Sequence, residues 1–68
     1  MTARPITTEV KLREIRRELG QRNHVYARLV AAGKMTQATA DWQIAVLEAV
    51  KRDYEAQAEA EQAQGRLL

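Results

Sequence analysis

Apolar positions recur along the first half of the chain at alternating intervals of three and four residues. This seam reads Leu12, Ile15, Leu19, Arg22, Tyr26, Leu29 and Gly33. Such intervals keep one face of a helix turned toward a neighbouring helix, as in a coiled coil. The residues between them are mostly Ala, Glu, Gln, Arg and Lys, which favour helix. The pattern predicts a helix over about 8–32.

Capping residues mark both ends of this first helix. Thr7 or Thr8 can accept a hydrogen bond from an exposed amide of the first turn, and Glu9 suits the positive end of the helix dipole. Gly33 suits the left-handed conformation that ends many helices. We expect a turn at 33–35, which is long enough only for an antiparallel return.

A second apolar seam follows the turn. Thr36 is the expected N-cap, and Met35 before it can pack on Ala40 as a hydrophobic staple. The seam consists of Ala40, Ile44, Leu47, Val50, Tyr54 and Ala58. It predicts a helix over about 36–63. Together the two seams predict one all-α domain, residues 1–68, built as an antiparallel, coiled-coil-like two-helix hairpin.

Two residues of the first helix do not fit this simple picture. The antiparallel return places Arg22, the charged residue of the seam, opposite Leu47. Its methylenes either cover the core, or the side chain sets the register or reaches a partner chain. Gly20 costs about 1 kcal/mol relative to Ala inside a helix, and it would admit another backbone or a slight bend.

A second apolar stripe lies outside the seam of the second helix. Trp42, Val46 and Ala49 follow one another at helical spacing, and one partner helix cannot cover both stripes. Short chains without disulfides or metals need very good packing or a partner subunit, and this 68-residue chain has no cysteine. We expect a homodimer that forms a four-helix bundle, with these three residues at the interface. A half-exposed tryptophan along a monomeric hairpin is the alternative.

Charge divides unevenly between the two halves of the chain. The net charge is +2, with eight basic and three acidic residues in 1–34 and three basic and six acidic residues in 35–68. One stripe of the first helix, opposite the seam, carries Arg13, Arg17, His24 and Arg28. Such a stripe binds an acidic protein or phosphates, or it is a solvated face that attracts an acidic helix. We assign partner binding to the three arginines.

Few residues of the chain could carry out chemistry. The chain has no cysteine and a single histidine, His24, and it contains no glycine-rich phosphate loop and no Ser-His-Asp arrangement. A two-helix rod also offers little concavity for a substrate. We expect no enzymatic activity, no cofactor and no metal site. A helix-turn-helix is disfavoured because a third helix is missing and the second helix is acidic.

No apolar stretch approaches the ~18 residues that a membrane-spanning helix needs. The N-terminal residues, 1–5, lead into a charged stretch without the apolar core of a signal peptide. We therefore expect a cytoplasmic protein without a membrane partner.

The residues around the turn are similar to those of a known family. The matching core reads Val-Tyr-x-Arg-Leu-Val at 25–30, Gly-Lys-Met-Thr-Gln at 33–37 and Ala-Asp at 40–41. It resembles short proteins from the early regions of transposable, Mu-like phages and prophages, a family that includes quorum-sensing anti-activators. Many relatives carry proline after the tyrosine, where this chain has Ala27, so the first helix should run straighter here.

The resemblance implies a small helical dimer that binds and inhibits host proteins. Targets in that family include a LuxR-type transcriptional regulator of quorum sensing and a pilus-assembly ATPase. Two other hypotheses stay open from the residues themselves. One is a dimer that binds nucleic acid through the basic stripe, and the other is a purely structural oligomer within a phage assembly.

Overall fold

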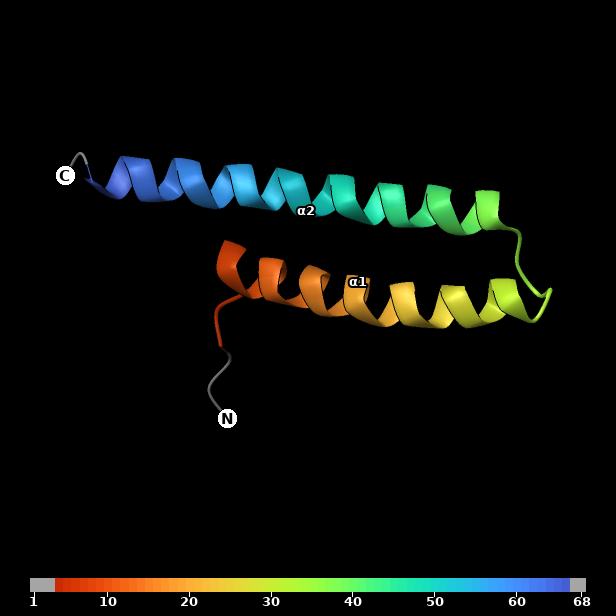
Figure 1. Cartoon of the computed structure of the whole chain (residues 1–68). Coiled ribbons are helices and arrows are strands. Elements are labelled where there is room, and N and C mark those ends of the chain that lie inside the picture. The colour runs from red at the N-terminus through yellow and green to blue at the C-terminus, as the bar shows by residue number, and fades with distance from the viewer. Residues whose placement is uncertain (1–3, 67–68) are drawn as a thin grey trace.

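Two antiparallel helices make up the part of the chain that the computed structural model describes, residues 4–66 (Figure 1). Helix α1 spans Thr8–Ala31 and helix α2 spans Gln37–Arg66, with no strand in the described range. The predicted all-α hairpin is confirmed. Helix α1 ends one residue before the expected bound, and α2 runs past its expected end. Residues 1–3 and 67–68 of the expected domain lie outside the described residues.

The start of α1 separates the roles of its two threonines. Thr7 is the N-cap, and its side chain accepts a hydrogen bond from the amide of Val10 at 3.2 Å. Thr8 is buried, and its hydroxyl donates to the Glu61 carboxylate of α2 at 2.8 Å. Thr7 therefore caps the start of α1, and Thr8 ties the open end of the hairpin together.

The turn follows the expected chemistry. Gly33 has a φ of 72°, in the left-handed region that side chains rarely adopt. The amide of Lys34 donates to the Leu29 carbonyl at 2.9 Å, which satisfies one of the free carbonyls at the end of α1. The hydroxyl of Thr36 accepts a hydrogen bond from the amide of Thr39 at 3.1 Å, which confirms the predicted N-cap of α2.

The core is a single seam between the helices. The largest buried residues come from α1, whereas the buried apolar residues of α2 are alanines; together they are Leu12, Leu19, Tyr26, Ala40 and Ala58. The hairpin measures 53 × 32 × 12 Å, so it is one helix thick. Each helix therefore packs on one neighbour and keeps the opposite side open.

The register of the seam agrees with the expected return from the turn. Tyr26 of α1 donates to Gln43 of α2 at 2.6 Å, and Arg22 and Leu47 line the same hollow, as expected. Across residues 4–66, neither helix combines the length and the apolar character that crossing a membrane requires.

Candidate protein-interaction surfaces

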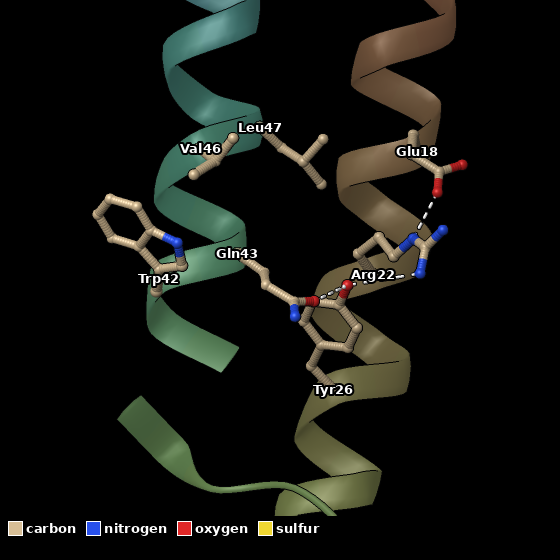
Figure 2. Close-up of a pocket in the computed structure, with 7 residues that line it drawn as sticks. All are labelled: Glu18, Arg22, Tyr26, Trp42, Gln43, Val46 and Leu47. Carbon is tan, nitrogen blue, oxygen red and sulfur yellow. Dashed lines mark hydrogen bonds and ion pairs between the residues drawn. The ribbon is translucent and has the colours of Figure 1, made fainter. Parts of the chain in front are cut away.

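A shallow groove of about 450 Å³ opens between the turn-proximal halves of the two helices (Figure 2). Its lining consists of Glu18, Arg22, Tyr26, Trp42, Gln43, Val46 and Leu47. Polar side chains from both helices meet in the middle of the groove, while apolar side chains of α2 form one rim (Figure 2). The groove thus joins the seam to the exposed surface of α2.

The polar centre of the groove is a chain of hydrogen bonds. The buried Tyr26 hydroxyl donates to Gln43, and the Arg22 guanidinium donates both to that hydroxyl, at 3.4 Å, and to Glu18. The hydrogen bond that Arg22 donates to Glu18 raises the pKa of Arg22, with a smaller contribution from Tyr26. The Arg22 side chain is 49% exposed. Its guanidinium therefore lies at the surface beside the link that crosses the seam.

The outer face of α2 is defined by Trp42, Val46 and Ala49. Its centre lies roughly 140° around the helix from the seam at about 100° per residue, and the Trp42 ring points away from α1 (Figure 2). Trp42 is 70% exposed, Val46 is 43% exposed, and Ala49 is also exposed. Nothing within the described hairpin covers these residues. Their place in a dimer interface stays a prediction.

The outer face of α1 is defined by Arg13, Arg17, His24 and Arg28, all of which are exposed. At about 100° per residue this face lies directly opposite the seam. Arg17 pairs with Glu14 at 2.9 Å. Within residues 4–66, no carboxylate lies within ion-pair distance of Arg13 or Arg28. This face is therefore cationic and only partly compensated.

Gly20 lies on α1 beside this cationic face. A Cβ atom added to it would meet nothing within 4 Å, so the hairpin itself does not require a glycine there. Helix α1 runs through Gly20 and Ala27 without interruption from Thr8–Ala31. The glycine therefore leaves open space on the side of α1 that faces away from α2.

Two features of these surfaces were not expected from the sequence. The first is the role of Gln43 as the partner of Tyr26. It could have been predicted, because a buried tyrosine hydroxyl needs a hydrogen-bond partner and the predicted register places a residue near position 43 opposite Tyr26. The second is a cleft at the start of α1 that contains Ile6, which is 75% exposed. The exposure of Ile6 was harder to predict, because an apolar residue just before an N-cap usually packs back on the helix.

Within residues 4–66, no cluster of three or more His, Asp and Glu side chains is placed to hold a metal ion. Comparison of the chain with protein-family models, with curated proteins and with solved structures found no match. The resemblance to early-region proteins of Mu-like phages therefore stays a prediction carried by the residues around the turn.

Proposed function

We propose that this chain is a small homodimeric adaptor that binds and inhibits a protein of the phage's host. One observation carries the proposal: the two outer faces lie on opposite edges of the hairpin and differ in chemistry. The outer face of α2 is apolar, which suits a second copy. The outer face of α1 is cationic, which suits an acidic partner. The inhibitory role comes from the resemblance alone.

The surface area of the hairpin supports self-association. A compact folded monomer of 7.7 kDa exposes about 4,300 Å², whereas this chain exposes 5622 Å². The excess is about 1,300 Å², which exceeds the ~800 Å² that each partner buries in a standard interface. A second copy on the outer face of α2 would cover its largest exposed aromatic side chain.

Such a dimer leaves the cationic faces accessible. A two-fold axis beside α2 makes the interface self-complementary and places both α1 helices on the outside of a four-helix bundle. Arg13, Arg17 and Arg28 of each copy would then face solvent. An acidic surface on a host protein, such as the LuxR-type regulator or the pilus-assembly ATPase that the resemblance implies, would find the same cationic face on either side.

Light scattering with size-exclusion chromatography tests the dimer. We expect the wild type at twice 7.7 kDa and Trp42→Ala at the monomer mass or unfolded. The matched control is Ile6→Ala, because Ile6 is as exposed as Trp42 but lies outside the outer face of α2. A monomeric wild type would contradict the dimer, and a large or open-ended assembly would favour the structural oligomer instead.

Binding to a purified LuxR-type regulator tests the partner. We expect a stoichiometric complex that the double variant Arg13→Ala/Arg17→Ala weakens about tenfold, since truncating charges at an interface costs on the order of 1–2 kcal/mol. The control Lys34→Ala/Arg52→Ala removes the same charge from elsewhere. Equal binding by both double variants would remove the outer face of α1 from the proposal.

A nucleic-acid partner is the second candidate for this cationic face. Its affinity would fall steeply with salt because bound phosphates release counterions. The pairing of Arg17 with Glu14 and the acidic balance of residues 35–68 weaken this alternative. Duplex DNA that shifts with the wild type at low salt, but not with Arg13→Ala/Arg17→Ala, would favour it over the regulator.

A further inference from the structure

A cleft of about 560 Å³ lies at the N-terminal end of the outer face of α1. Its lining includes the apolar residues Pro5, Ile6 and Val10 and the charged residues Arg4, Arg13 and Glu14. The segment before α1 leaves the helix on the side away from α2 (Figure 1). The cleft and the cationic face therefore lie on the same edge of the hairpin.

The helix cap sets the shape of this cleft. Thr7 accepts a hydrogen bond from the Val10 amide through its hydroxyl at 3.2 Å and one from the Lys11 amide through its carbonyl at 3.0 Å. These two bonds fix the direction in which the chain leaves α1. Ile6 lines the same cleft as Val10 and is 75% exposed. The side chain is thus an apolar surface that its own helix does not cover.

We propose that this cleft receives an apolar side chain from an acidic segment of the bound protein. Arg4 and Arg13 supply positive charge in the lining, and Arg17 follows one turn further along the face. Glu14 also lines the cleft, but its carboxylate is engaged by Arg17 at 2.9 Å. An apolar side chain flanked by carboxylates complements a lining that combines apolar side chains with guanidinium groups. The inference rests on the proposed function and specifies its partner segment.

Other occupants fit this cleft less well. A second copy that covers Trp42 and Val46 would lie on the opposite edge of the hairpin. Phosphates would pair with the arginines but would leave the apolar residues Pro5, Ile6 and Val10 without a role. An apolar centre within a polar rim is the usual anatomy of a protein interface.

Nuclear magnetic resonance with the ¹⁵N-labelled full chain tests the cleft. The probe is a short synthetic peptide of glutamates around one central leucine. Two control peptides replace the leucine by alanine or all glutamates by glutamine. We expect shift changes at Ile6, Val10 and Arg13, with affinity about tenfold weaker for each control peptide and for Ile6→Ser. Because Ile6 lies outside the helix and is exposed, Ile6→Ser should keep the fold, which circular dichroism verifies.

The possible outcomes separate this inference from the proposed function. Equal affinity of the leucine and alanine peptides, with shifts only at Arg13, Arg17 and Arg28, overturns the cleft but leaves the cationic face intact. Shifts at Trp42 and Val46 instead overturn the cleft and assign the peptide to the outer face of α2. The absence of any shift also overturns the cleft, while the regulator experiment still decides the proposed function. Val25→Ser, at an exposed apolar residue outside the cleft, should bind like the wild type.

Discussion

The outer faces of α1 and α2 are both open to solvent, yet one is cationic and the other is apolar. The face of α2 carries Trp42, which is 70% exposed, beside Val46 and Ala49. The face of α1 carries arginines, of which Arg17 has a partner at 2.9 Å. Both faces exist because a hairpin one helix thick, 12 Å, has only one seam. The difference between them indicates what each can bind.

The free energies available on the two faces indicate that they serve different roles. Burying a large apolar side chain contributes about 1.5–3 kcal/mol, whereas an exposed ion pair contributes about 0–1 kcal/mol and weakens with salt. In a two-fold interface every contact occurs twice. The outer face of α2 should therefore determine whether copies associate, and the outer face of α1 should determine which charged partner is captured and how that depends on salt.

Placing a glutamate on each helix in turn should give the largest difference between the two faces. Ala49→Glu places a carboxylate on the outer face of α2, where a second copy would desolvate it at a cost of several kcal/mol. We expect the dimer dissociation constant to rise at least about 100-fold, measured by analytical ultracentrifugation. Ala27→Glu adds the same group to an exposed position of α1 and should leave the dimer intact. Equal effects of the two variants would show that the faces do not differ in this way.

The hairpin could be predicted from the sequence because its signals are local. Each helix end is set by a residue type with a specific backbone or capping role, such as Thr7, Gly33 and Thr36. The seam could be predicted because its spacing repeats over several turns. Helix α2 continues past its expected end because its last residues are good helix formers, and Gly65 lies inside it. Gly65 lacks the positive φ that Gly33 has at the end of α1, so it does not act as a helix-ending residue.

The interaction surfaces could be predicted only in part. The exposed stripes follow from helical spacing, so Trp42 and Arg13 lie where the sequence places them. The cleft around Ile6 could not be predicted, because it depends on the path of residues before the cap. Nor could the roles of Thr7 and Thr8 be distinguished, since both can cap. The structure distinguishes them, because the Thr7 hydroxyl accepts from the Val10 amide and the Thr8 hydroxyl donates to Glu61.

Tyr26–Gln43 is one of two hydrogen bonds between α1 and α2 in residues 4–66, and the other is Thr8–Glu61. Tyr26→Phe removes the donor to Gln43 but keeps the ring in place, so unfolding should become easier by about 1–1.5 kcal/mol. Urea denaturation at one protein concentration measures this, because the stability of the proposed dimer would depend on concentration. Tyr54→Phe is the control: Tyr54 is half-buried, with Lys11 over its ring, 5.8 Å from the centroid. If both variants lose the same stability, the bond to Gln43 has no special role.

Replacing Gly20 and Gly33 by alanine should change the stability of the fold in opposite directions. Gly20→Ala should stabilise the fold by about 1 kcal/mol, because the added methyl meets open space within a helix. Gly33→Ala should destabilise it by about 1 kcal/mol, because its φ is 72°. Thermal unfolding followed by circular dichroism shows whether each variant is more or less stable than the wild type. If Gly20→Ala gains stability and also loses partner binding, a partner backbone approaches α1 at this point.

The smallest expected effect comes from removing one surface ion pair on each helix. Glu14→Gln breaks the i,i+3 pair with Arg17, and Glu48→Gln breaks the i,i+3 pair of α2 with Lys51. Each should cost about 0.2–0.5 kcal/mol of stability. Only Glu14→Gln releases an arginine beside the cleft, so only this variant should bind the glutamate–leucine peptide about twofold more tightly, with a steeper dependence on salt. A similar gain from Glu48→Gln would mean that net charge, rather than the outer face of α1, attracts the acidic segment.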